Sequence, residues 1–154
     1  MKAWVLSKPA PVDDAPLLLE QRPLSQPGTQ QLRLRVHPCG VCHTDLHLVA
    51  GELSHPELPV VPGHQVVGVV DALGDGVAGW KIGDRVGVPW LCHTCGMCSF
   101  SCGGQENLCQ SARFIGYHVD GGYAEYALVH VDFPVRIPPV YSLIWPSRSC
   151  CAWV

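Results

Sequence analysis

The chain has 154 residues, of which 47% are hydrophobic and 15% are charged, and its formal net charge is −3. This length and balance are typical of one globular domain and exclude an intrinsically disordered chain. The negative charge is unsuited to a nucleic-acid or anionic-membrane surface. No apolar run approaches the ~20 residues of a membrane-spanning helix, and the start lacks the apolar stretch of a signal peptide. We therefore expect neither nucleic acid nor a membrane as a partner.

The first half of the chain predicts short strands separated by loops. Residues 2–6 read as a strand, and residues 31–36 alternate polar and apolar side chains, which is typical of a strand with one buried face. Five prolines between positions 9 and 27 predict a loop-rich stretch. A short helix is expected over residues 44–50, closed by Gly51.

The remainder predicts further strands. Residues 66–73 are continuous and β-branched, which indicates a buried strand, and shorter strands are expected at 85–88 and 123–129. The 16 glycines and 14 prolines favour many turns over long helices. Closely spaced short strands indicate a mainly β, barrel-like domain.

A glycine motif follows the strand predicted at 66–73. Gly74, Gly76 and Gly79 have the G-x-G-x-x-G spacing of dinucleotide-binding folds. In those folds the last glycine opens a helix whose N-terminus holds the pyrophosphate. Residues 80–84 contain another glycine and no amphipathic pattern, so we expect a hairpin loop and no Rossmann unit.

The nine cysteines are many for this length, and five of them lie between Cys92 and Cys109. The start shows no export signal, and several of the cysteines have two-residue spacing. Metal binding in a reducing cytoplasm therefore explains them better than a secreted disulfide framework. We expect a cytoplasmic, metal-binding protein.

A dense group of metal-binding side chains follows the strand predicted at 31–36. The run GVCHTDLH at 40–47 holds one thiol, two imidazoles and a hydroxyl, and His64 lies 22 positions beyond Cys42. Thiolate and imidazole are donors that zinc prefers, and catalytic zinc takes three protein ligands and keeps an open position. A hydroxyl and a second imidazole beside it could relay a proton. The pattern predicts part of a catalytic zinc site.

These residues resemble the zinc-dependent alcohol dehydrogenases of the medium-chain dehydrogenase/reductase family. The likeness runs from Met1 to about Tyr141, in the family's order and at nearly its spacings. It is carried by residues 40–47, 62–64, 80–88, 95–109 and 120–126. The resemblance implies a GroES-like catalytic domain over residues 1–141, a partly open β-barrel with short helices and a cysteine-rich zinc lobe at 92–109.

The resemblance also implies the roles of single residues. Cys42 and His64 would be two of the three protein ligands of a catalytic Zn²⁺, which lowers the pKa of a bound alcohol. Thr44 would accept the alcohol proton and pass it toward His47 and solvent. Cys42 or His64 alone would more often be an ordinary core or surface residue, and a surface helix also tolerates His47, but their joint order favours the site. No role is predicted for His37, Cys39 and His55.

Neighbouring positions complete the implied site. His43 would contact the pyrophosphate of NAD(P), and Asp45 would orient a ligand or the surrounding loop. Trp90 and residues 114–117 are expected to line the substrate pocket. Gln65 departs from the glutamate that usually follows the zinc histidine and removes one negative charge near the ion. Zinc binding is still expected because the direct donors remain.

The cysteine lobe departs from the family's structural zinc site. The family spacing C-x2-C-x2-C-x7-C would place a thiol at position 101, where this chain has Ser101, and the thiol comes one residue later at Cys102. Either Cys102 takes the fourth position by a one-residue slip, or three thiolates remain and zinc binding is weak or lost. Cys92 and His93 are alternative donors. We expect the slip, with the ligands Cys95, Cys98, Cys102 and Cys109.

Residues 142–154 do not fit the resemblance. The family would show a third catalytic cysteine ligand there and then a nucleotide-binding domain. Reading the same bases one position earlier can turn residues 143–146 into Ala-Asp-Leu-Ala and residues 150–154 into Leu-Leu-Cys-x-Gly. We therefore expect a frameshift near Ser142, with Cys151 as an alternative third ligand, and the coding sequence would show a Rossmann-like open stretch in the next frame.

Three classes of function compete. The leading one is the catalytic domain of an NAD(P)-dependent zinc alcohol dehydrogenase, which converts a small alcohol to an aldehyde or ketone, is homo-oligomeric at full length and is inactive as this chain alone. A zinc-binding interaction module is disfavoured, because no Lys or Arg lies between Cys92 and Cys109. A GroES-like fold without chemistry is disfavoured by the order of Cys42, Thr44 and His64.

Overall fold

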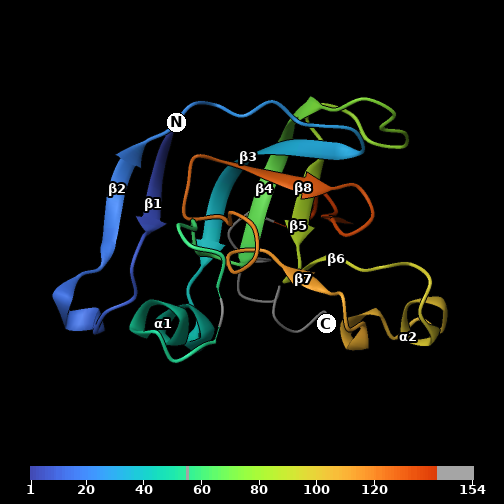
Figure 1. The fold of residues 1–154 in the computed structure, drawn as a ribbon. Helices are drawn as coiled ribbons and strands as arrows, with labels where there is room; N and C mark the ends of the chain where they lie inside the picture. Colours follow the sequence, from blue (N-terminus) through green and yellow to red (C-terminus); the bar gives the residue numbers. More distant parts are fainter. Residues whose placement is uncertain (55, 142–154) are drawn as a thin grey trace.

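A five-stranded sheet forms the centre of the structure, a computed structural model that describes residues 1–54 and 56–141 (Figure 1). Its strands pair antiparallel throughout. In spatial order they are β8 (Tyr126–His130), β3 (Gln31–Gly40), β4 (Gln65–Leu73), β5 (Arg85–Val88) and β9 (Val135–Arg136).

Two smaller sheets and four short helical segments surround this sheet. The first small sheet pairs β1 (Lys2–Leu6) with β2 (Leu17–Gln21), and the second pairs β6 (Leu91–His93) with β7 (Arg113–Phe114), both antiparallel. The helical segments are α1 (His43–Ala50), α2 (Ser99–Cys102) and the 3-10 turns η1 (Val12–Asp14) and η2 (Glu106–Leu108). In Figure 1 α1 lies below β1 and β2, whereas α2 lies at the far end of the molecule. The mainly β prediction is confirmed, with open sheets.

Most predicted elements are present. The strands at 2–6 and 85–88 have their predicted bounds, and α1 begins one residue earlier than expected and ends before Gly51, which adopts φ 80°. Strand β8 begins at Tyr126 instead of residue 123, because residues 123 and 124 pair elsewhere, with Pro62 and with β1. Strand β2 lies in the stretch that the sequence predicts as loop.

The loop after β4 is the predicted hairpin. Strands β4 and β5 pair antiparallel, with Val66 opposite Val88, and the glycine motif lies in the turn between them. Gly76 and Gly79 adopt φ of 72° and 79°, which suits a turn and not the start of a helix. Among residues 1–54 and 56–141 all paired strands are antiparallel, so this part of the chain holds no Rossmann sheet. The same residues include no helix with the length and hydropathy needed to cross a bilayer.

The core lies between the central sheet and the segments that cover it. Its largest cluster comes from alternate positions of the sheet strands, which point to the same face because side chains of a strand alternate. The cluster consists of Leu32, Leu34, Val66, Val70, Val86, Val88, Ile115 and Val129, each no more than 3% exposed.

The pairing of β3 with β4 brings together two segments that are distant in the sequence. The register places Gly40, the last residue of β3, opposite Gln65, the first residue of β4. The chain turns into α1 directly after β3, with Cys42 as the residue before the helix. His64 immediately precedes β4. Cys42 and His64 therefore approach one another because the two strands end and begin at the same edge.

Three backbone hydrogen bonds from residues 121–123 hold the backbone before His64. Gly121 N–H donates to Val61 O at 2.7 Å, Gly122 N–H to Gly63 O at 2.8 Å, and Tyr123 N–H to Pro62 O at 3.0 Å. Gly63 has φ 95°, and a Cβ there would lie 2.5 Å from the Tyr123 ring. Glycine is therefore required at this position, both for the backbone conformation and for the space.

Candidate metal centres

The thiol of Cys42 and the imidazole of His64 point toward one another. The distance from Cys42 Sγ to His64 Nε2 is 3.3 Å, and His64 is only 4% exposed. Asp45 completes the group, because one ligand atom from each of the three residues lies within 4.8 Å of the other two. Thiolate, imidazole and carboxylate are all zinc donors. The structure thus brings together the two ligands predicted for the catalytic zinc.

Asp45 holds the other two residues in place. Its Oδ2 accepts the Cys42 backbone N–H at 2.9 Å, and its Oδ1 lies 3.2 Å from His64 Nδ1, inside a site where Asp45 is 3% exposed. A proton on Nδ1 directed to Asp45 leaves the lone pair of Nε2 facing Cys42 Sγ, which is the tautomer that binds a metal. Both carboxylate oxygens are thus engaged, one with the Cys42 backbone and one with the His64 ring, which is a geometry suited to the predicted orienting role.

Hydrogen bonds and charges in this group shift the pKa values of all three residues, although the Asp45 charge itself opposes the Cys42 thiolate. Burial opposes the Cys42 thiolate. Hydrogen bonds from the Thr44 hydroxyl and backbone N–H, together with the charge of His64, nevertheless lower the pKa of Cys42. Burial disfavours the imidazolium, but the hydrogen bond and charge of Asp45 raise the pKa of His64. Burial likewise opposes the Asp45 carboxylate, and its hydrogen bonds to His64 and Cys42 lower its pKa. The group therefore favours the thiolate form of Cys42, which is the form that binds zinc.

Aromatic residues enclose one side of His64. The Trp90 ring centroid lies 5.6 Å from that of His64 and 4.5 Å from that of Phe114. The structure thus places two residues predicted to line the substrate pocket next to the site. Tyr123 lies on the side of Asp45, and burial together with the charge of Asp45 raises the pKa of its hydroxyl. No role was predicted for Tyr123 from the sequence.

The predicted proton-relay and cofactor residues lie on α1. Thr44 hydrogen bonds to Cys42, so its hydroxyl is at the site. His43 and His47 are exposed on the helix, with ring centroids 6.4 Å apart. His47 Nδ1 lies 2.5 Å from Glu52 Oε2, an acidic partner that the sequence analysis missed although it stands five residues after His47.

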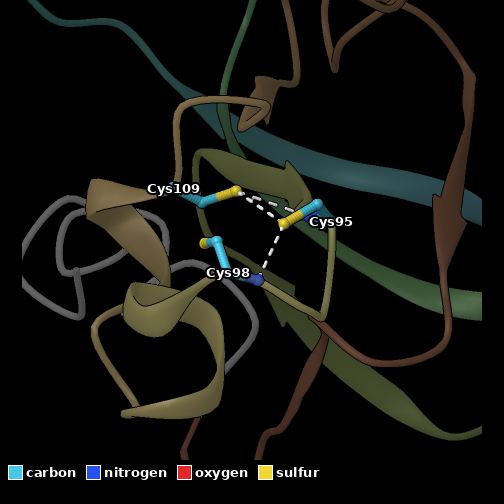
Figure 2. Close-up of side chains that lie close together, drawn as sticks. All are labelled: Cys95, Cys98 and Cys109. Atoms are coloured by element: carbon cyan, nitrogen blue, oxygen red, sulfur yellow. Dashed lines mark hydrogen bonds between the residues drawn. The ribbon is translucent and has the colours of Figure 1, made fainter.

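A second cluster lies in the lobe around α2 and η2 (Figure 2). The side chains of Cys95, Cys98 and Cys109 converge, with ligand atoms within 4.8 Å of one another. Cys109 Sγ lies 3.6 Å from Cys95 Sγ, and the backbone N–H groups of Cys95 and Cys98 donate to Cys109 Sγ and Cys95 Sγ, each at 3.4 Å. Backbone hydrogen bonds from Met97 and Cys98, together with the Ser101 hydroxyl, lower the pKa of Cys95 to about 6. The structure therefore brings these three predicted ligands together, and the thiolate form is favoured at Cys95.

Cys102 is not part of this cluster, contrary to the predicted slip. Its side chain is exposed, and its Sγ contacts Gly96 O at 3.6 Å. Ser101 faces the thiols instead, with its Oγ 3.2 Å from Cys98 Sγ and 3.7 Å from Cys95 Sγ. Cys98 Sγ caps the start of α2 by accepting the Ser101 N–H at 3.4 Å, which holds Ser101 against the thiols.

The other described candidates are not among the donors of either cluster. Burial raises the pKa of Cys92 to about 11, so this thiol stays protonated, and His93 is exposed. Gln65 is buried at the start of β4, beside His64 in the chain. His55, the predicted frameshift at Ser142 and the alternative ligand Cys151 lie outside the described residues.

Comparison with known proteins agrees with this geometry. Residues 28–139 match the family described as "Alcohol dehydrogenase GroES-like domain". An alcohol dehydrogenase of Geobacillus stearothermophilus is 46% identical over 125 residues, which are 80% of this chain and 37% of that protein.

Solved structures give the same result. A cobalt- and zinc-bound thermostable alcohol dehydrogenase from Pyrobaculum aerophilum superposes with a TM-score of 0.86 at 32% identity, covering 96% of this chain and 44% of that one. A short chain alcohol dehydrogenase from E. coli CFT073, complexed with NADH, gives a TM-score of 0.85 at 31% identity, covering 96% and 41%. The chain spans less than half the length of each relative. The family match covers most of the sequence and includes both clusters, so the chain belongs to the family of the alcohol dehydrogenase GroES-like domain.

Proposed function

We propose that residues 1–141 form the catalytic domain of a zinc-dependent alcohol dehydrogenase, which converts a small alcohol to an aldehyde or ketone with NAD(P). The observation that supports this most is the approach of Cys42 Sγ to His64 Nε2 at 3.3 Å, with Asp45 orienting both residues. Cys42 and His64 would hold the zinc. Bound zinc would supply Lewis acidity that lowers the pKa of the substrate hydroxyl, while NAD(P) would accept the hydride.

The chain's own residues would handle the proton and the substrate. The Thr44 hydroxyl, which hydrogen bonds to Cys42, would accept the proton of the alcohol. His47 is exposed and paired with Glu52, so its imidazole would carry the proton toward solvent. The Trp90 ring beside His64, packed against the Phe114 ring, would exclude water from the carbon chain of the substrate.

The cofactor would be bound jointly with a part of the protein outside the described residues. His43 is exposed at the first turn of α1, where it could contact a pyrophosphate. The E. coli structure contains NADH, and the Pyrobaculum structure contains zinc and cobalt. We further propose a cytoplasmic location, because Cys42, Cys95, Cys98 and Cys109 form no disulfide, and a homo-oligomer for the full-length enzyme.

Zinc content measured on variants tests this proposal. His64→Gln is expected to lower the zinc content by one ion per chain, because it removes a donor atom of the Cys42 group. His37→Gln, which changes an exposed histidine with no proposed role, is the matched control and should keep the full content. The chain alone should also show no saturable binding of NAD(P). Equal zinc content in wild type and His64→Gln would contradict the proposal.

A further inference from the structure

The lobe around α2 presents four donor atoms, of which only three are sulfur. Tetrahedral Zn–S bonds of ~2.3 Å place neighbouring donors about 3.8 Å apart. Cys109 Sγ lies 3.6 Å from Cys95 Sγ, and Ser101 Oγ lies 3.7 Å from Cys95 Sγ and 3.2 Å from Cys98 Sγ. The three sulfurs of Figure 2 thus form one face of a tetrahedron, and the Ser101 hydroxyl lies at its fourth corner.

A hydroxyl at this corner binds zinc weakly. Structural zinc sites are closed by four thiolates or by three thiolates and an imidazole, and a serine hydroxyl is neither. The lobe is also open to solvent, because no residue of α2 is buried and Gly96, Met97, Gly103 and Gly104 beside it are exposed. An external donor can therefore reach the corner that Ser101 occupies.

Charge favours a neutral donor there. Three thiolates and Zn²⁺ already leave one net negative charge, so a fourth thiolate adds repulsion, whereas an imidazole adds none. Three thiolates with one imidazole form a donor set that zinc takes in structural sites.

We propose that Cys95, Cys98 and Cys109 hold a zinc ion whose fourth position, occupied by the Ser101 hydroxyl, is exchangeable and accepts an external nitrogen donor of the imidazole type. This proposal does not depend on the catalytic zinc at Cys42 and His64. Cys102 does not supply the fourth donor in this structure, because its exposed Sγ contacts Gly96 O while Cys98 Sγ accepts the Ser101 N–H and holds Ser101 at the thiols.

Cadmium-113 NMR of the cadmium-loaded full chain tests the proposal, because the resonance moves downfield with each sulfur ligand. The lobe resonance is assigned by its loss in Cys95→Ser, and the Cys42 site by its loss in His64→Gln, so the two sites are read separately. We expect the wild-type lobe resonance to lie upfield of that in Ser101→Cys and to shift when imidazole is added. The resonance of Ser101→Cys should not respond to imidazole.

Cys102→Ser separates this proposal from the slip. If Cys102 is not a ligand, this variant has the wild-type lobe resonance and the same imidazole response. Zinc transfer to a chelator should be at least ~10-fold faster from the wild-type lobe than from Ser101→Cys. An upfield shift in Cys102→Ser, an imidazole-insensitive wild-type lobe or no lobe resonance at all would each overturn the proposal.

Discussion

Asp45 shows how one buried carboxylate can prepare a metal site before any metal binds. Its two oxygens fix the backbone at Cys42 and the ring of His64, so both donor atoms are oriented by the same residue. The free energy needed to order the ligands is therefore supplied by folding and does not weaken metal binding. An amide at this position could not accept two hydrogen bonds and remain a negative partner of His64.

Replacing Asp45 should weaken the Cys42 site specifically. We expect Asp45→Asn to lower its zinc affinity by ~10–100-fold, because one oxygen cannot serve both the Cys42 N–H and the His64 ring and the negative charge beside the ring is lost. Competition with a zinc chelator measures this change. Asp13→Asn, which changes an exposed carboxylate in η1, is the control and should leave the affinity unaltered. Equal affinities in the two variants would show that Asp45 does not orient the site.

The residues that come together were easier to predict from the sequence at the Cys42 site than in the cysteine lobe. Cys42 and His64 could be paired because their spacing and neighbours follow the family's order, and strand pairing then brings them together. The inward-facing residue of the lobe depends instead on a single helical turn, which the sequence does not specify. Ser101 and Cys102 are adjacent, and the bond from the Ser101 N–H to Cys98 Sγ holds Ser101 rather than Cys102 at the sulfurs.

At the scale of elements, the contact between residues 61–63 and 121–123 determines where His64 points. Three backbone hydrogen bonds hold the two segments together, and Gly63 allows them to approach. Gly121 serves the same approach, since a Cβ there would lie 2.2 Å from Gly63 O.

A substitution at Gly63 should therefore lower the free energy of unfolding by more than backbone strain alone would. Gly63 and Gly79 both have positive φ, but a Cβ at Gly63 meets the Tyr123 ring at 2.5 Å, whereas a Cβ at Gly79 meets nothing within 4 Å. We expect Gly79→Ala to cost about 1–2 kcal/mol from its left-handed backbone alone. Gly63→Ala should cost clearly more in urea denaturation and also lower zinc affinity at His64. Equal losses of stability would contradict the role given to this contact.

Asp84, in the turn between β4 and β5, should make the stability of the fold depend on pH. Asp84 is 9% exposed and accepts hydrogen bonds from Arg136 Nη1 at 2.6 Å and from the Lys81 N–H at 3.0 Å. Burial opposes the carboxylate, but the Arg136 hydrogen bond and charge outweigh it and lower the pKa of Asp84. Its contribution is therefore present above the unfolded pKa of about 4 and lost as the pH falls through the lower folded value.

Urea denaturation at pH 7 and pH 3 measures this term. Wild type should be more stable than Asp84→Asn at pH 7, and the difference should shrink at pH 3. The control is Asp75→Asn in the same loop, where the side chain is exposed. A difference between wild type and Asp84→Asn that does not change with pH would exclude the ion pair as its cause.

The elements that the sequence predicted are those with a clear hydrophobic pattern. Strand β4 is rich in valine, and β5 has a valine on either side of a glycine, so a strand could be predicted at each. Strand β2 escaped prediction because its five residues lie between Pro16 and Pro23, and its pattern is set only by pairing with β1. Long-range pairing of this kind leaves no local signal.

At the scale of the whole molecule, the sheet core carries the stability on which both clusters depend. Leu34 is fully buried in that core, and Leu18 on β2 is 59% exposed. We expect Leu34→Ala to cost about 2–5 kcal/mol of unfolding free energy, because it leaves a cavity. Leu18→Ala should change stability by no more than about 0.5 kcal/mol. If denaturant unfolding showed similar losses of unfolding free energy for Leu34→Ala and Leu18→Ala, the core would not lie where the structure places it.

The joint zinc site of Cys42 and His64 is the central claim, and anomalous diffraction at the zinc edge from crystals of the zinc-loaded chain tests it most directly. The account predicts a peak at ~2.3 Å from Cys42 Sγ and ~2.0–2.1 Å from His64 Nε2, with Asp45 still bonded to His64 Nδ1. A fully loaded crystal without a peak between these two atoms would contradict it.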